Sequence, residues 1–495
     1  MTAVGDYNRA GSGEGLRREA IGLREVLFQS ITDMAPGAAI AASIPAGVAF
    51  AGGALPLAVV FALIASLFCA WSVGELARHL PAAGSLATYA ARGLHPSLGF
   101  LVAWGYVLVG ALIPPLVLLQ LGFTVAATLN SEFGISPGLW WPWTVLGALI
   151  VLAAGFYGVR TSTGMGTILG AFEVGVFLVL AVFFVVHAGS NNTGAVFTTT
   201  YTPSAHAGFS GVIAGSVYTI LAFGGFESAA PLAEEARDPR RTVRRAVLGA
   251  TLLIGLLYVF TTYAADVAFG PARFSGFGLS GPHSWEGLSR SLYGIFWVFV
   301  FFAIVNSTIA NANAGTNVSS RTAYAMGRIH AFPYAFARVH LRHRSPYVAI
   351  IAFSALSLGI ALGLGVAFSP TVGFVIVATA LVIVLVGIYI VVDIACIGFF
   401  ARPGRRFNPI AHGLIPLLGV LTFIPAWLTA AGVKVFSFVT PLTPPYSYAG
   451  IAVGGYMFVG LLYLLFLYTR DPGRVTDVGL VHLDAEPDLT EAPPA

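Results

Sequence analysis

Long apolar runs separated by short polar segments dominate this sequence of 495 residues. A helix that crosses a membrane needs about 20 apolar residues, and twelve segments reach that length. Lipid offers the backbone no hydrogen-bond partner, so such runs fold as helices. The predicted fold is an all-α integral membrane protein with 12 transmembrane helices. The predicted spans are 28–50, 55–77, 97–127, 138–159, 164–187, 209–233, 243–269, 291–318, 346–368, 371–400, 410–431 and 446–469.

Charged residues make up only 9% of the chain, against about 25% in soluble domains. No basic segment interleaved with aromatic residues is present, so we predict no nucleic-acid partner. The sequence has no G-x-x-x-x-G-K-[ST] loop and a single lysine, Lys434, which argues against ATP hydrolysis. The acidic residues are scattered singly, and we predict no metal site, no cofactor and no enzyme activity.

Basic residues are distributed unevenly between the predicted loops. All but three of the 25 lysines and arginines fall on one side, the exceptions being Arg273, Arg290 and Lys434. Because cytoplasmic loops carry an excess of positive charge, both termini are predicted to be cytoplasmic. The predicted location is the plasma (inner) membrane, crossed many times.

The first predicted span contains Pro36 and Gly37, about a third of the way along. Proline removes a backbone donor and kinks a helix, and glycine loosens it. The small residues Ala38, Ala39 and Ala41 would let a ligand approach the amides that begin the next half-helix. Such amides favour a carboxylate. The alternative is a kinked helix that packs closely through small residues.

The sixth predicted span contains Gly224 and Gly225 at about mid-depth, followed by Glu227. Each glycine weakens a helix by about 1 kcal/mol relative to alanine. In lipid, a broken helix is tolerated where it faces protein or a water-filled cavity. An unwound segment beside a buried acid is typical of the midplane binding site of a solute carrier.

These two interruptions fall in the first and sixth spans, which begin two possible repeats of five helices. An odd number of helices places the repeats in opposite orientations in the membrane, and paired interruptions then indicate a transporter site. The predicted segments are a cytoplasmic tail (1–26), a first inverted repeat (27–190), a second inverted repeat (191–402), the last two spans (403–469) and a disordered acidic tail (470–495).

Three segments resemble the amino acid–polyamine–organocation (APC) superfamily of permeases. The segment AFGGFESAAPLAEEARDPRRTVRRAV at 222–247 is similar to the signature of its sixth helix. PAAGSLATYAARGLHPSLGFLVAW at 81–104 resembles the loop between its second and third helices, and SSRTAYAMGR at 319–328 resembles the end of its eighth. The resemblance implies a LeuT-like core with broken helices 1 and 6.

The resemblance also implies how a substrate binds. Its carboxylate would meet the amides of the first interruption, and its ammonium group would meet carbonyls of the second. Phe223 would form a lid or wall, or else simply pack as an apolar residue. Glu227 would gate the broken helix or cap its freed backbone donors. The predicted substrate-binding residues are Ala35, Pro36, Gly37, Ala38, Ala39, Ala222, Phe223, Gly224, Gly225 and Glu227.

Coupling to an ion is assigned to a different acid. Glu173 lies in the middle of the fifth span, where an ionisable residue is costly and is expected to be functional. In some relatives a lysine in this region takes the place of a sodium ion, so the resemblance favours Glu173 as the group that binds a proton. The predicted ion-coupling residues are Glu173, Asn306, Ser307, Thr308 and Asp33.

The sequence therefore predicts a secondary transporter that moves amino acids by alternating access. The expected mode is proton-coupled uptake of a neutral amino acid, because the walls of the predicted site are small and apolar. An amino acid or polyamine exchanger is the alternative. A membrane-embedded transferase is disfavoured by the scattered acids, and a channel by the two interruptions. The expected partners are the small-molecule substrate, the lipid bilayer and a proton.

Overall fold

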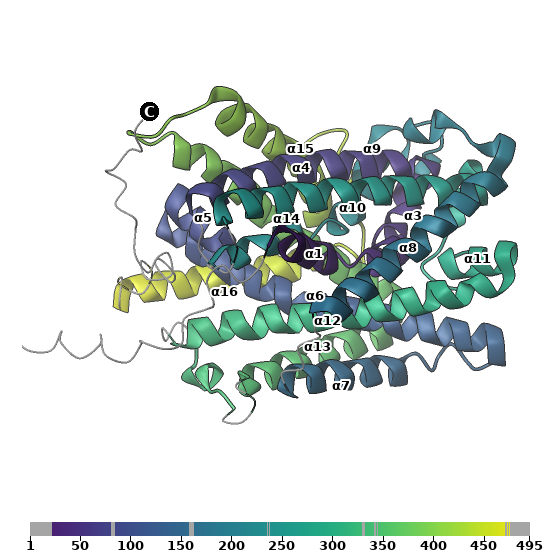
Figure 1. Ribbon diagram of the computed structural model, residues 1–495, viewed down its shortest axis with the longest axis horizontal. Coiled ribbons are helices and arrows are strands. Elements are labelled where there is room, and N and C mark those ends of the chain that lie inside the picture. The colour runs from purple at the N-terminus through teal and green to yellow at the C-terminus, as the bar shows by residue number, and fades with distance from the viewer. Residues whose placement is uncertain are drawn as a thin grey trace, which may run out of the picture.

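The computed structural model describes residues 22–80, 85–157, 163–234, 236, 238–328, 332–340, 343, 345–470, 473 and 475. Residues 1–21 of the predicted amino-terminal tail, and nearly all of the predicted carboxyl-terminal tail, lie outside the described residues. Within the described residues the chain forms helices and their connections, with no β-sheet (Figure 1). This agrees with the predicted all-α class.

The long helices run along one another in a single bundle (Figure 1). They are α4 (Leu55–His79), α6 (Pro96–Phe133), α7 (Trp141–Tyr157), α8 (Thr163–Ala188), α10 (Pro239–Phe269), α12 (Trp297–Arg328), α13 (Tyr347–Phe368), α14 (Pro370–Phe400), α15 (Ile415–Ala431) and α16 (Tyr448–Arg470). The shorter helices are α1 (Leu23–Asp33), α2 (Pro36–Ala38), α3 (Val48–Ala51), α5 (Ser85–Gly93), α9 (Phe209–Leu221) and α11 (Trp285–Tyr293).

Ten helical stretches of the described chain are long and apolar enough to cross a membrane. The first, Leu23–His79, contains both of the first two predicted spans in one continuous stretch. The helix α7 has 17 residues and is a shorter apolar helix. The chain is therefore a multi-pass helical protein, and the count of twelve spans stays a prediction.

One predicted boundary differs clearly from the structure. The eighth span was expected to begin at residue 291, but residues up to Tyr293 belong to the short helix α11, and α12 begins at Trp297. Gly294, with φ of 55°, separates the two helices. Periodicity could not reveal this turn, because apolar residues continue through it.

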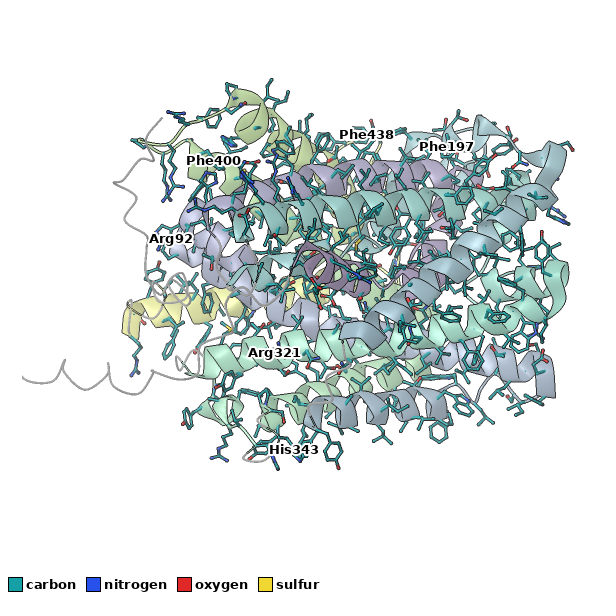
Figure 2. The ribbon with its side chains drawn as sticks, in the orientation of Figure 1. Arg92, Phe197, Arg321, His343, Phe400 and Phe438 are labelled. Atoms are coloured by element: carbon teal, nitrogen blue, oxygen red, sulfur yellow. The ribbon has the colours of Figure 1, made fainter. Side chains whose placement is uncertain are left out.

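Three helix pairs define the centre of the bundle. The helix α4 packs along α10, and α6 packs along both α12 and α14. Glu75 of α4 forms an ion pair with Arg244 of α10, at 3.1 Å. Figure 2 shows Arg92 and Arg321 in the left half of the bundle and Phe197 in the right half.

Candidate functional site

The first interruption separates α1 from α2. The helix α1 ends at Asp33, and Ala35 takes a left-handed conformation with φ of 45°. Pro36 then begins α2, a position that suits proline because the first turn needs no backbone donor there. The break therefore lies just before the predicted Pro36 and Gly37 pair. It continues into a π-helix (Ala39–Ser43) and a 3-10 turn (Pro45–Gly47) before α3.

The second interruption separates α9 from a 3-10 helix, η7 (Phe226–Glu234). Residues 222–225 form turns, and Gly225 has φ of 111°, a conformation that favours glycine. The predicted double-glycine break is thus present in the structure. The second half of this segment is a 3-10 helix instead of the expected α-helix, and it contains Pro231, which cannot donate to an α-helical ladder.

The two interruptions touch each other through their backbones. A Cβ atom added to Gly225 would lie 2.7 Å from the carbonyl carbon of Asp33 and 2.9 Å from the amide nitrogen of Met34. Beside this contact, the Ser30 hydroxyl donates to the Phe226 carbonyl at 2.9 Å. We call this contact the backbone joint, made by Gly225 and the Asp33–Met34 peptide. It requires glycine at position 225.

Glu173 of α8 lies at the first interruption. Its side chain is 4% exposed, and its Oε2 atom accepts a hydrogen bond from the Gly37 amide at 3.4 Å. Asn306 of α12 donates its side-chain amide to Oε1. Ser307 also borders the site, since its Cβ and Glu173 Oε2 both lie within 3.2 Å of where a Gly37 Cβ would be. The structure thus brings together three of the predicted coupling residues.

The other two predicted coupling residues lie differently. Thr308 is buried, but its hydroxyl donates to the Val305 carbonyl within α12. Asp33 is half-buried, and its carboxylate accepts a hydrogen bond from Gln29 on its own helix at 3.3 Å. Neither residue is joined to Glu173 by a hydrogen bond among the described contacts.

Glu227 is buried at the second interruption and accepts three hydrogen bonds. The Gly225 amide donates to Oε2 at 3.0 Å, and the Tyr389 hydroxyl of α14 donates to the same oxygen at 2.8 Å. The Tyr106 hydroxyl of α6 donates to Oε1 at 3.4 Å. The carboxylate therefore caps a freed backbone donor, as one of the two predicted roles requires.

Phe223 is fully buried. Its ring packs edge-on against Tyr258 of α10, with ring centroids 5.4 Å apart. Alanines 35, 38, 39 and 222 are also buried, at 5% exposure or less. The walls around the two interruptions are therefore small and apolar, apart from the polar groups described above.

Several residues that hold the interruptions were not predicted. Tyr258 donates to the Met34 carbonyl at 3.1 Å, and Asn311 of α12 donates to the Asp33 carbonyl at 3.0 Å. Gln120 of α6 donates its Nε2 to the Ala38 carbonyl at 3.0 Å. These contacts satisfy carbonyl groups that the broken helix leaves free. A sequence signal existed for Gln120, the only amide or charged side chain between residues 96 and 129.

A small cavity lies next to the first interruption on its α11 side. It is lined by Ala41 of the first broken helix, Thr124 of α6, Ile304 of α12 and Glu286 of α11. The cavity thus lies between the first broken helix, α6, α12 and the short helix α11.

Comparisons with known proteins agree with this architecture. A family model described as "Amino acid permease" matches residues 25–471. The low-affinity putrescine importer PlaP of Escherichia coli (strain K12) is 30% identical over 313 residues, which cover 62% of this chain and 66% of that protein. This chain therefore spans slightly under two thirds of that relative's length.

Two further relatives carry other names. The branched-chain amino acid permease BcaP of Bacillus subtilis (strain 168) is 24% identical over 369 residues, covering 72% of this chain and 77% of that protein. The histidine permease HisP of Lactococcus lactis subsp. cremoris (strain MG1363) is 29% identical over 322 residues, covering 60% and 62%. All three relatives are permeases and not enzymes. Since the family model covers nearly the whole chain, this protein belongs to the amino acid permease family, within the APC superfamily that its motifs resemble.

Proposed function

We propose that this protein is a secondary active transporter that moves an amino acid or a related amine across the plasma membrane by alternating access. The observation that carries the proposal is the backbone joint, where two interrupted helices meet at Gly225 and the Asp33–Met34 peptide. Paired interruptions of this kind build a binding site that can be reached from either side of a membrane. The names of the three relatives support this class of substrate.

The substrate is proposed to bind between the two interruptions. Its carboxylate is assigned to the backbone amide of Ala38, where the second half of the first broken helix begins. The Ala39 amide already donates to the Ala35 carbonyl at 2.9 Å. Its ammonium group is assigned to the carbonyls of residues 222–225. The small apolar walls favour a neutral amino acid, as in the sequence-based expectation.

Proton coupling is assigned to Glu173. Its carboxyl group is buried and lies on α8, yet it contacts the Gly37 amide of the first interruption. Binding a proton would weaken this contact, because a neutral carboxyl group is a poorer acceptor than a carboxylate. Proton binding at Glu173 would therefore change how the first broken helix is held.

The fold is proposed to contain two inverted repeats, 27–190 and 191–402, followed by two helices in 403–469. The corresponding positions of the interruptions in α1–α3 and in α9–η7 support this division. The arginine-rich side and both termini are placed in the cytoplasm by the positive-inside rule. The tails 1–26 and 470–495 would then extend into the cytoplasm.

Counterflow in proteoliposomes tests the proposal. Purified protein is reconstituted with an excess of unlabelled leucine, histidine or putrescine inside, and the labelled solute is added outside. A carrier accumulates label transiently by exchange. Absence of counterflow with every amino acid and amine tested, using protein that is folded by size-exclusion chromatography, would contradict transport.

An amino acid or polyamine exchanger is the second candidate, as in the sequence-based expectation. Efflux of labelled solute into a medium without substrate separates the two modes. Uptake coupled to a proton predicts efflux that is accelerated by a matching pH gradient. Obligatory exchange predicts efflux only when a substrate is present on the other side.

A further inference from the structure

Gln120 holds the first interruption with only half of its amide group. Its side chain is 1% exposed, and its Nε2 atom donates to the Ala38 carbonyl at 3.0 Å. This contact fixes the orientation of the amide, because a carbonyl can only accept. The other amide atom, Oε1, is buried without a hydrogen-bond partner among the described residues.

An unpaired buried carbonyl oxygen is costly, because it has given up its hydrogen bonds to water. Most buried side-chain acceptors are paired, so one that is left unpaired calls for an explanation. Gln120 lies on the face of α6 that meets the first broken helix, at the residue that follows Gly37. The Gln120 amide therefore lies beside the first interruption, where the substrate is proposed to bind.

The polar residues of α6 continue this face towards the cavity. Thr124 and Thr128 follow Gln120 at intervals of four residues, which places all three on one side of the helix. Thr124 lines the cavity, and the Thr128 hydroxyl donates to Glu286 at 3.0 Å. The stripe thus connects Gln120 with a buried acid.

The Thr128 end of this stripe meets charged side chains of α11. Glu286 and Glu132 share one arginine, Arg290, with which both form ion pairs. Polar groups therefore continue from Gln120 along this face of α6 to the short helix α11.

We propose that Gln120 is a substrate-binding residue whose Oε1 atom accepts a hydrogen bond from the substrate's ammonium group. This inference rests on the proposed function and names a chemical group that the site recognises. The ammonium group is then held by Gln120 on α6 and by carbonyls of the second interruption.

The test compares each solute with its fully N-methylated analogue, which keeps the positive charge but has no N–H donor. The probes are leucine, histidine and putrescine, and binding is measured on the full-length protein in nanodiscs. A hydrogen bond to a charged group contributes about 1.5–3 kcal/mol, which corresponds to a factor of about 10 or more in Kd. We expect N-methylation to weaken binding to the wild type by at least this factor.

In the Gln120→Leu variant we expect this penalty for N-methylation to fall about tenfold. A purely structural role, in which Gln120 only supports Ala38, would weaken both members of each pair equally and leave the ratio unchanged. An unchanged ratio would therefore overturn the inference. The Gln120→Glu variant keeps an acceptor oxygen, and we expect it to retain the discrimination that the leucine variant loses.

Two further measurements keep the outcomes distinct. If Gln120→Leu does not fold, Gln120→Asn withdraws the oxygen by one methylene group and should show the same loss of discrimination. If the wild type binds and exchanges a solute but the ratio is unaffected, the proposed function stands and the role of Gln120 is wrong. If the wild type neither binds nor exchanges any of the probes, both proposals are wrong.

Discussion

The two helix interruptions each contain a buried carboxylate that accepts a hydrogen bond from a freed backbone amide, but the carboxylates come from different places. At the second interruption, Glu227 lies two residues from the amide it caps, that of Gly225. At the first interruption, the amide of Gly37 is capped by Glu173, which is 136 residues away on α8. A carboxylate therefore caps a backbone amide in both interruptions. In the second interruption both groups belong to one segment, and in the first they belong to different helices.

The proposed division between a supporting acid and a coupling acid rests on this difference. Glu227 belongs to the segment whose amide it caps, although Tyr106 of α6 and Tyr389 of α14 also donate to it. Glu173 belongs to α8, so its hydrogen bond from the Gly37 amide joins the first interruption to a different helix. A two-state element that a bound ligand can bias is what coupling requires. The predictions below test this contrast.

The largest expected effect follows from Glu173→Gln. Glutamine keeps the size of the side chain but cannot bind and release a proton. We expect accumulation driven by an inward proton gradient to be abolished, while counterflow in the absence of a gradient is retained. Uptake in proteoliposomes, with and without the gradient, measures both.

Glu227→Gln is the matched variant for this prediction. It is expected to lower the stability of the purified protein by about 2 kcal/mol, because charge-assisted hydrogen bonds to a buried group are weakened. Accumulation and counterflow should then fall together. If pH-driven uptake persists in the Glu173 variant and is lost selectively in the Glu227 variant, the two roles have been assigned the wrong way round.

The next effect concerns the backbone joint. Gly225→Ala would place a Cβ atom 2.7 Å from backbone atoms of Asp33 at a positive φ, and we expect a loss of about 3 kcal/mol in stability. Gly37→Ala meets its nearest atoms at 3.0 Å with no positive φ, so about 1 kcal/mol is expected. Thermal unfolding of the purified variants gives the ranking.

Gly175→Ala provides the control for the glycine series. A Cβ atom on Gly175 of α8 would meet nothing within 4 Å, and alanine favours a helix over glycine. We expect this variant to unfold at the wild-type temperature or slightly above it. An equal loss of stability in the Gly225, Gly37 and Gly175 variants would show that the joint is not packed more closely than the rest of the bundle.

A smaller effect is expected at the tyrosines that hold Glu227. Tyr389→Phe removes the 2.8 Å hydrogen bond, and Tyr106→Phe removes the 3.4 Å one. We expect losses of about 2 kcal/mol and about 0.5 kcal/mol, since short bonds to a charged group are the stronger ones. Thermal unfolding with and without substrate measures both. The reverse ranking would contradict the assignment of Tyr389 as the main partner.

A further modest effect is expected from Ser30→Ala. This variant removes the hydroxyl that links α1 to the Phe226 carbonyl, at a cost of about 1 kcal/mol. Thr32→Ala is the control, because its hydroxyl donates within α1 to Phe28. Counterflow rates should change in the Ser30 variant alone. Identical rates in both variants would mean that this side-chain link between the interruptions has no part in transport.

Much of the fold could be predicted from the sequence, because apolar runs of sufficient length must be helical in lipid. The two interruptions were also predictable, since Pro36, Gly224 and Gly225 disfavour a continuous helix. The short helix α11 was missed because apolar residues bridge its end and the start of α12. Its role beside the cavity depends on tertiary packing, which periodicity does not encode.

The partners of the interruptions were harder to predict than the interruptions themselves. Glu173 and Asn306 were identified because polar groups in apolar helices are costly and conspicuous. Tyr106, Tyr258 and Tyr389 were not, because a tyrosine in an apolar run is equally consistent with simple packing. The register of one helix against another decides which carbonyl or carboxylate each hydroxyl reaches. That register cannot be read directly from the sequence.

The backbone joint has a consequence for how selectivity can change. The joint is made of main-chain atoms at Gly225 and the Asp33–Met34 peptide. Main-chain atoms do not distinguish one solute side chain from another, so the joint can serve many solutes equally well. Recognition of a particular solute then falls to the surrounding side chains. An engineer who wishes to redirect this carrier to a new molecule should therefore leave the joint intact and vary its neighbours, beginning with Gln120 and Phe223.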